Sequence, residues 1–191
     1  IENPFFKWQW FHNLETSNSV SQSTGWQPIY FLAFKNEELQ AIAPLFLKNH
    51  SFGEFIFDHS FVRLAKDLDL NYYPKLIGMS PYSPIEGYQF LYKDNNIDRC
   101  GITSLLLDHI ELFALKNKIL SCNFLYVNDD WGELLTNLGY HHWINTRSEW
   151  EARGEKTFTD FLNRFNSNQR KNIRKERKSI IDQNMHIRTY K

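Results

Sequence analysis

The chain has 191 residues, of which 42% are hydrophobic and 16% aromatic, and its 22 basic and 22 acidic residues give a formal net charge of zero. This aromatic content excludes a disordered chain, and the length suffices for one globular domain with the start of a second. Because the net charge is zero, any anion-binding function must depend on local clusters of basic residues. Cys100 and Cys122 are too few for a disulfide framework, so we expect a reducing, cytoplasmic location.

The ends of the sequence predict that it belongs to a longer protein. The chain begins at Ile1, without a methionine, and ends in MHIRTYK, an alternating pattern that is typical of an interrupted strand. We therefore expect a C-terminal half that is missing here. No apolar run approaches the length of a bilayer-spanning helix, so we expect no transmembrane segment.

The first half of the chain predicts a helix followed by strands. Asn3 can cap a helix that has Pro4 at its first position. Residues 28–61 contain apolar stretches separated by KNEEL and KNHSFG, which predicts a β-meander, and residues 62–70 predict a short helix. Residues 71–87, NYYPKLIGMSPYSPIEG, predict a buried strand followed by a rigid loop rich in proline and tyrosine.

The second half alternates helices and strands, in the order helix 101–118, strand 122–128, helix 129–140 with an acidic cap, and strand 141–152. Thr157 and Asp160 can cap a short helix, and Asn166 to Asn168 break or re-cap it before a basic helix. This order predicts a mixed α/β sheet flanked by helices. We expect one domain in residues 1–154 and the beginning of a second half in residues 155–191.

Several motifs resemble those of known acyltransferases. Residues 98–128, DRCGITSLLLDHIELFALKNKILSCNFLYVN, resemble the central unit of GNAT acyltransferases, in which a basic or Gln residue and two glycines open a helix that holds the pyrophosphate of coenzyme A. The strings APLFLKNHSFGEFIFD, YYPKLIGMSPYSPIEG and SNQRKNIRKERKSI resemble the FemAB-like predicted N-acyltransferases, named for a suspected role in peptidoglycan biosynthesis or recognition. The resemblance, from about Asn3 to the C-terminus, implies a GNAT-like first half.

The chain departs from the GNAT pattern at two positions. Asp98 stands where a basic or Gln residue is expected, and Thr103 stands at the second small residue. A carboxylate repels pyrophosphate, and a β-branched side chain blocks close approach of the backbone. We therefore expect this half not to be active alone with acetyl-CoA. The alternative, that residues 101–118 simply form a core helix, stays open.

A basic segment, QRKNIRKERK, carries six cations and one acid, Glu176; the cations are Arg170, Lys171, Arg174, Lys175, Arg177 and Lys178. We interpret Arg170, Lys171, Arg174 and Lys175 as contacts to the phosphates of a donor substrate, either acyl-CoA or aminoacyl-tRNA, and expect no tightly bound cofactor. A lipid-linked pyrophosphate is a further possible partner. The alternative is a solvated helix face.

The segment KNHSFGEFIFDH offers acidic candidates. In an extended strand, residues four apart are separated by ~13 Å, so His50, Glu54 and Asp58 could not share a metal ion, and we expect none. Glu54 and Asp58 could point into a substrate cleft as a general base or hydrogen-bond acceptor. The alternative is that both carboxylates cap loops at strand ends.

The proline-rich loop predicts a fixed set of polar and aromatic side chains, namely Tyr72, Tyr73, Lys75, Tyr82, Ser83 and Glu86. Such a set suits the binding of sugars or peptide amides, although a purely structural loop remains the alternative. The family resemblance implies transfer of an acyl or aminoacyl group to an amine-bearing acceptor. Two other readings stay open: a non-catalytic module that binds peptidoglycan precursor or nucleic acid, and a scaffold half.

Overall fold

The computed structural model describes residues 3–94, 96–146, 148–186 and 188. The chain forms two compact units, residues 1–143 and 144–191, and each is described by itself. The predicted domain boundary after residue 154 stays a prediction, because compactness alone does not define an independent domain. Among the described residues, no helix is both long and apolar enough to cross a bilayer.

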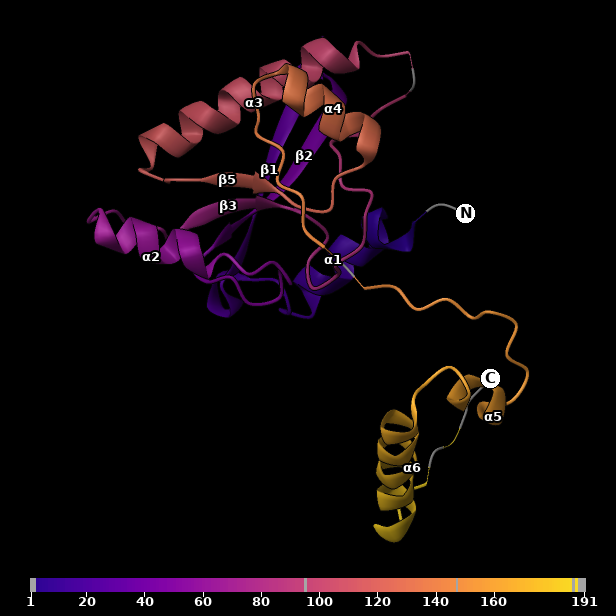
Figure 1. Ribbon diagram of the computed structural model, residues 1–191. Helices are drawn as coiled ribbons and strands as arrows, with labels where there is room; N and C mark the ends of the chain where they lie inside the picture. Colours follow the sequence, from indigo (N-terminus) through magenta and orange to yellow (C-terminus); the bar gives the residue numbers. More distant parts are fainter. Residues whose placement is uncertain (1–2, 95, 147, 187, 189–191) are drawn as a thin grey trace. The chain divides into compact units, whose positions relative to one another are not determined.

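The first unit is built on a mixed sheet (Figure 1), whose strands are β1 Trp26–Lys35, β2 Glu38–Lys48, β3 Lys75–Gly78, β4 Leu91–Tyr92 and β5 Cys122–Phe124. The order is β1-β2-β3-β5, and β4 also pairs with β2. The β1–β2 hairpin turns at Asn36 and Glu37, whose positive φ angles of 51° and 65° match the right-handed twist of the strands. β3 pairs antiparallel with β2 and parallel with β5, which confirms the predicted α/β class with a mixed sheet.

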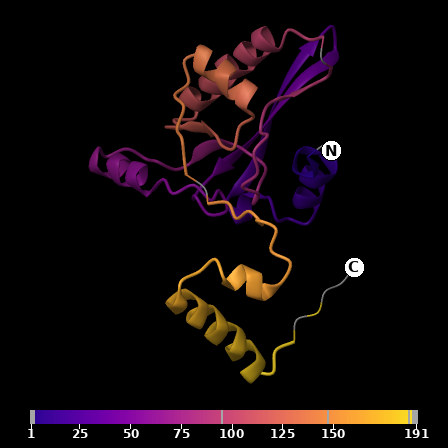
Figure 2. The same ribbon diagram turned by 45° about the vertical axis from the view of Figure 1, so that its right-hand side comes forward.

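Helices cover both faces of this sheet (Figures 1 and 2), with α3 Arg99–Lys116 and α4 Asp129–Asn137 on one face and α1 Trp8–Thr16 on the other. Successive residues of a strand point to opposite faces. In β2, Leu45 accordingly packs in the cluster that contains Ile110 of α3 and Trp131 of α4, whereas Phe46 packs with Phe11 of α1. In β3, Leu76 and Ile77 divide between the same two clusters. The unit therefore has three layers.

The N-terminal signals are confirmed in part. The Asn3 side chain accepts a hydrogen bond from the Phe5 amide, but it caps a short 3-10 helix, Pro4–Phe6, and α1 begins only at Trp8. The predicted acidic cap of α4 is wrong in detail. Asn128 caps this helix through the Trp131 amide, and the two acids that follow it lie in the first turn.

Two predicted strands are wrong. Residues 53–58 form an irregular loop instead of the last strand of the meander, and helix α2, His59–Asp67, begins three residues before its predicted start. Residues 141–146 and 148–152 form no strand. Both segments carry exposed aromatic side chains, including Phe57 and Trp150, so an apolar pattern did not mean burial.

The second unit contains α5 Phe158–Leu162 and α6 Ser167–Asp182. Thr157 and Asp160 cap α5 reciprocally, and Asn166 caps α6 through the Gln169 amide, so both predicted helix starts are confirmed. The predicted terminal strand, residues 185–191, lies largely outside the described residues. The finer GNAT-like assignment of the first unit stays a prediction.

Candidate functional site

Two lysines face each other at the ends of two core strands. Lys48 is the last residue of β2 and Lys75 the first of β3, and they are direct partners in the antiparallel ladder. Both side chains are buried. Like charges opposite each other in a sheet are destabilising, and a buried ammonium group requires an anionic partner. The loop between β2 and α2 supplies two such partners, Glu54 and Asp58, both also buried.

Lys75 is the centre of a buried polar cluster. Its Nζ atom donates hydrogen bonds to Glu54 Oε2 at 2.7 Å, Asp58 Oδ2 at 2.6 Å and Ser51 Oγ at 2.7 Å. An ammonium group has three protons, so these contacts use all of its donors. The cluster therefore pairs one cation with two carboxylates and keeps the loop attached to β3.

Asp58 accepts three hydrogen bonds through one carboxylate oxygen. Its Oδ2 atom accepts hydrogen bonds from Ser51 Oγ and Tyr72 OH, both at 2.7 Å, as well as from Lys75. Burial by itself raises the pKa of the Asp58 carboxyl, but the bonds from Lys75, Ser51 and Tyr72 outweigh it and hold the pKa below the ordinary value. Tyr73 OH extends the network through Ser51 Oγ at 2.8 Å. An aspartate of lowered pKa is a weak base, which favours a structural task for Asp58.

Glu54 has the opposite environment. Its side chain is only 1% exposed, and burial raises its pKa, although Lys75 and Lys48 act in the other direction. Its Oε1 atom has no hydrogen-bond partner within the described part of the chain and lies 4.0 Å from Lys48 Nζ. Paired groups with divergent pKa values often mark acid–base function. Of the two predicted carboxylates, Glu54 is thus the better candidate for a general base.

Lys48 was not among the residues predicted from the sequence. Its Nζ atom donates to the Phe52 carbonyl at 2.9 Å and lies 3.4 Å from the centroid of a Trp26 ring. Burial lowers the pKa of Lys48 to about 7, with Glu54 raising it and Lys75 lowering it. The available signal was a lysine that ends an apolar strand, but the cross-strand partner cannot be read from one sequence.

The convergence of Glu54 and Asp58 contradicts the geometry expected from the sequence. Treated as an extended strand, the segment would hold these carboxylates ~13 Å apart. The segment is instead a loop with Phe55 in the left-handed region, at φ 59°, so both carboxylates reach Lys75. Within the described ranges, no group of three His, Cys, Asp or Glu side chains could hold a metal ion.

The predicted substrate contacts divide into two groups. Tyr72, Tyr73 and Lys75 belong to the cluster, whereas Tyr82 donates to the Ser19 carbonyl at 2.8 Å and packs against Trp26. Ser83 Oγ donates to the nearby Pro81 carbonyl, and the backbone carbonyl of Glu86 accepts from the Asn3 side chain. These two contacts shape the loop that carries Ser83 and Glu86.

Comparison with known families agrees with the motifs in the sequence. The FemAB-like family, described as peptidoglycan biosynthesis/recognition, matches residues 1–191. The chain belongs to the FemAB-like family. No curated protein and no solved structure matches it significantly. Membership confirms the predicted resemblance and connects the chain with peptidoglycan.

In this FemAB-like chain, the N-terminus of α3 is closed by its own cap. The Asp98 side chain accepts a hydrogen bond from the Gly101 amide at 3.0 Å, and a Cβ atom added to Gly101 would lie 2.4 Å from Asp98 Oδ2. Thr103 is buried, and its hydroxyl contacts Tyr92 OH at 2.6 Å. The N-terminus of α3, where the resemblance to GNAT enzymes predicted a pyrophosphate site, therefore has one of its amides bonded to the carboxylate of Asp98.

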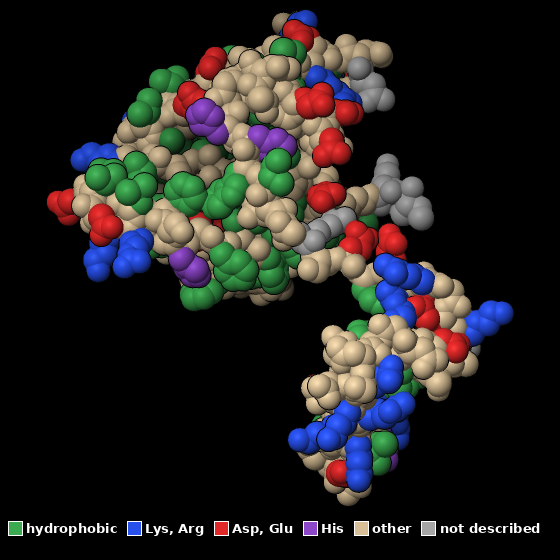
Figure 3. All heavy atoms as spheres, in the orientation of Figure 1, with side chains coloured by type: hydrophobic (Ala, Val, Ile, Leu, Met, Phe, Trp, Pro, Cys, Tyr) green, Lys and Arg blue, Asp and Glu red, His purple; other side chains and the backbone are tan. Residues whose placement is uncertain are grey.

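The basic helix α6 has two kinds of cation. Arg177 lies 3.9 Å from the centroid of the Phe158 ring, and Arg170 donates to the Phe165 carbonyl, so both contact the rest of the second unit. The other four cations are exposed at one-turn spacing and form no ion pair among the described residues; they are Lys171, Arg174, Lys175 and Lys178. Figure 3 shows basic side chains along this helix. We call these four residues the basic stripe.

The chain's charges are unevenly distributed. Residues 1–143 carry more acidic than basic side chains, whereas residues 144–191 carry twice as many basic as acidic ones. The positive potential of the second unit favours an anionic ligand at the basic stripe.

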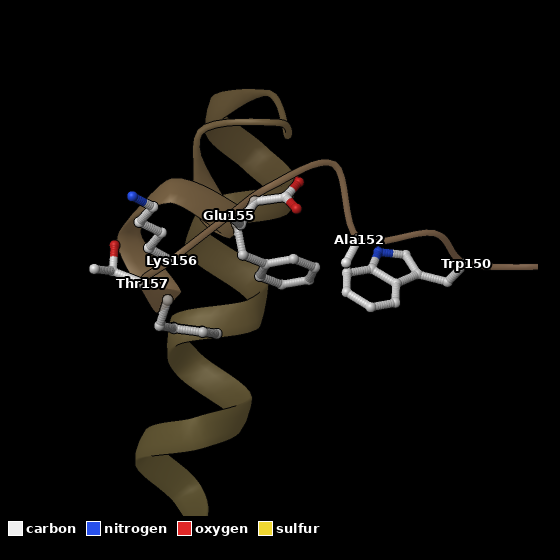
Figure 4. Close-up of a pocket in the computed structure, with 7 residues that line it drawn as sticks. Trp150, Ala152, Glu155, Lys156 and Thr157 are labelled. Atoms are coloured by element: carbon white, nitrogen blue, oxygen red, sulfur yellow. The ribbon is translucent and has the colours of Figure 1, made fainter.

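The second unit also has an open cavity of about 480 Å³, lined mainly by Trp150, Phe158 and Phe161 (Figure 4). None of the residues predicted for the site lines this cavity.

Proposed function

We propose that this chain takes part in N-acyl or aminoacyl transfer to an amine of a peptidoglycan precursor. One observation carries the proposal: Glu54 is buried beside two lysines, has a raised pKa and keeps one oxygen that has no hydrogen-bond partner among the described residues. A base is most effective when its pKa approaches the working pH, and a carboxylate of ordinary pKa is too weak. Glu54 therefore suits removal of a proton from an attacking amine.

In the proposed reaction, the amine nitrogen attacks the carbonyl carbon of an acyl ester or thioester. The new C–N bond forms as the C–O or C–S bond of the donor breaks, and Glu54 takes the proton from the amine and passes it to the departing alkoxide or thiolate. Lys75 holds Glu54 and Asp58 in position through its three hydrogen bonds. Its contribution is positioning, because none of its protons is available to a substrate in this arrangement.

The half-buried hydroxyl groups of Ser51, Tyr72 and Tyr73 form the outer edge of the cluster. An acceptor would meet these hydroxyls before it reaches Glu54, and tyrosine offers both a ring face and a hydroxyl to sugars and peptide amides. We therefore keep Tyr72 and Tyr73 as acceptor contacts. Tyr82, Ser83 and Glu86 support the adjoining loop.

The donor, acyl-CoA or aminoacyl-tRNA, would be held through its phosphates. The capped N-terminus of α3 does not favour this task, because Asp98 already occupies the Gly101 amide. The basic stripe is better suited, since its cations have no ion-pair partner among the described residues and lie on successive turns. Lys171, Arg174 and Lys175 remain the proposed donor contacts, and Arg170 acts by holding the connection between α5 and α6 through the Phe165 carbonyl.

A second candidate function is non-catalytic binding of peptidoglycan precursor or a polyanion. The closed N-terminus of α3 and the near-complete burial of Glu54 favour it. A binding module requires only affinity, whereas the proposed transferase requires a base whose removal stops turnover. This difference can be measured.

The test is transfer from acetyl-CoA or an aminoacyl-tRNA to an amine-bearing precursor peptide, followed by mass spectrometry. Glu54→Gln should lower kcat by about 100-fold or more while retaining the fold, since general bases contribute 10²–10⁴. The matched control is Glu133→Gln, an exposed position on α4. Full activity of Glu54→Gln would refute the base assignment. Precursor binding without transfer by the unmodified chain would establish the binding module instead.

A further inference from the structure

The loop between β2 and α2 has its polar and apolar side chains in the reverse of the usual arrangement. Its two acids, Glu54 and Asp58, are buried, whereas Phe52 and Phe57 are 80% and 81% exposed and Phe55 is also exposed. Burying charges is costly and burying phenylalanine is favourable, so folding alone would select the opposite arrangement. The bonds from Lys75 hold the acids inside and thereby keep the phenylalanines in water.

Helix α2 continues this exposed surface. Phe61, Leu64 and, at the end of the helix, Leu68 are exposed and lie at helical spacing, while Ala65 is the buried residue of α2. The Phe61 ring also contacts the ring of the half-exposed Trp143, at 4.9 Å between centroids. Figure 3 shows hydrophobic side chains gathered over this part of the first unit. We call the six exposed loop and helix residues, Phe52, Phe55, Phe57, Phe61, Leu64 and Leu68, the phenylalanine surface.

The charges around the surface indicate what it contacts. Because Glu54 and Asp58 are buried, the exposed ionisable side chains between residues 52 and 66 are His59, Arg63 and Lys66. At 100° per residue, Arg63 and Lys66 lie on the side of α2 away from Phe61 and Leu64. Acidic residues, Asp67 and Asp69, appear only where the helix ends.

An apolar helix face with cations on the opposite side, extended by protruding aromatic side chains, is the arrangement of segments that lie in a membrane interface. Anionic lipid headgroups complement Arg63 and Lys66, while the acyl boundary accommodates the phenylalanines. We propose that the phenylalanine surface docks on a lipid bilayer that contains anionic lipids. The proposal does not depend on acyl transfer, since it concerns only residues that are outside the Lys75 cluster.

The test is flotation of the whole chain with vesicles of phosphatidylcholine and phosphatidylglycerol in a 7:3 ratio. The double variant Phe52→Ser and Phe57→Ser should bind at least about tenfold more weakly, since two aromatic side chains no longer leave water. Both side chains are exposed, so the thermal stability should not fall. The matched control is Leu112→Ser with Leu115→Ser, two exposed leucines of α3, which should bind as the unmodified chain does.

The basic stripe of α6 could also attract anionic vesicles, so binding is repeated at 0.5 M NaCl. Salt screens attraction between exposed charges but leaves apolar insertion, and the difference between the Phe variant and the control should persist. Equal binding by the two double variants, or no binding by the unmodified chain, would overturn the proposal. A micromolar dimer, seen by light scattering and lost in the Phe variant, would assign the surface to contact between two copies and would also overturn it.

Discussion

Lys75 Nζ lies 2.7 Å from Glu54 Oε2 in the interior of the first unit, and the other oxygen of Glu54 has no hydrogen-bond partner among the described residues. Replacing a complete buried ion pair by apolar residues is often neutral for stability, whereas removing one partner is costly. The Lys75 cluster is therefore weak evidence for stabilisation. An incompletely satisfied carboxylate that the fold nevertheless holds in place is better explained by function.

Removal of Lys75 should show how much free energy it costs to bury Glu54 and Asp58 without a cation. Lys75→Met leaves Glu54 and Asp58 buried without a cation between them, and we expect the free energy of unfolding to fall by about 3–5 kcal/mol. Urea denaturation followed by fluorescence measures this. The matched control is Lys116→Met, an exposed lysine of α3, which should change stability by less than about 0.5 kcal/mol. A loss below about 1 kcal/mol for Lys75→Met would show that the cluster is not a compensated buried network.

Five members of this cluster could be predicted from the sequence, but Ser51 and the contacts between the members could not. Glu54, Asp58, Tyr72, Tyr73 and Lys75 all stand in the motifs that resemble the family. The alternation of GEFIFD favours a strand, and in a strand its acids would lie apart. The deciding contact joins residues 17 or 21 positions apart in the sequence, across two segments. Such a distant pairing overrides the local pattern, and no single-sequence signal encodes it.

The lowered pKa of Lys48 should make the stability of the fold depend on pH. Its pKa falls from 10.5 in an exposed chain to about 7 in the folded state. Between these values the unfolded state keeps a proton that the folded state has released, so stability rises with pH through this window. We expect the unmodified chain to gain stability relative to Lys48→Met between pH 6 and 9, with a slope of at most about 1.4 kcal/mol per pH unit. Urea denaturation at each pH measures the difference.

Glu54 has the opposite effect in the acidic range. Its raised pKa means that, above pH 4.5, the folded state retains a proton that the unfolded state has lost, so its contribution lowers stability as pH rises through that window. Glu54→Gln removes this effect, and because the Glu54 charge raises the pKa of Lys48, the variant should move the Lys48 window to lower pH without abolishing it. Parallel stability curves for Lys48→Met and the unmodified chain from pH 6 to 9 would contradict a depressed lysine pKa.

The cap of α3 should be visible in both stability and ligand binding. Asp98→Ala removes the acceptor of the Gly101 amide, and we expect a loss of about 1 kcal/mol in the free energy of unfolding. Asp98→Asn keeps the cap without the charge and should cost little. Thermal-shift titrations with acetyl-CoA, matched against ADP, are made in the Lys171→Ala, Arg174→Ala background so that the basic stripe does not contribute, and neither that chain nor its Asp98→Asn version should show selective binding. A selective shift in this background would mean that Asp98 does not close this helix end to phosphate.

The fold could be predicted best where the signals are local. The apolar spacing of α3 and the reciprocal caps of Thr157 with Asp160 lie within a few residues of the elements that they define. The strand predicted for residues 141–152 failed, because a strand also requires a pairing partner elsewhere in the chain. The two residues of β4 form a strand only through pairing with Ala41 and Ile42 of β2, which no local signal in the sequence indicates.

We predict that binding of single-stranded RNA to the basic stripe weakens as the salt concentration rises. Lys171→Ala with Arg174→Ala removes two cations that have no ion-pair partner among the described residues, so the fold should remain intact. Each lost phosphate contact should lower the slope of log K against log salt by about 0.7 for single-stranded RNA, or about 1.4 for the pair. Filter binding between 50 and 300 mM NaCl measures the slope. Lys116→Ala with Lys118→Ala, two exposed lysines at the end of α3 in the first unit, is the matched control, and an equal reduction in slope there would indicate non-specific attraction to the whole chain.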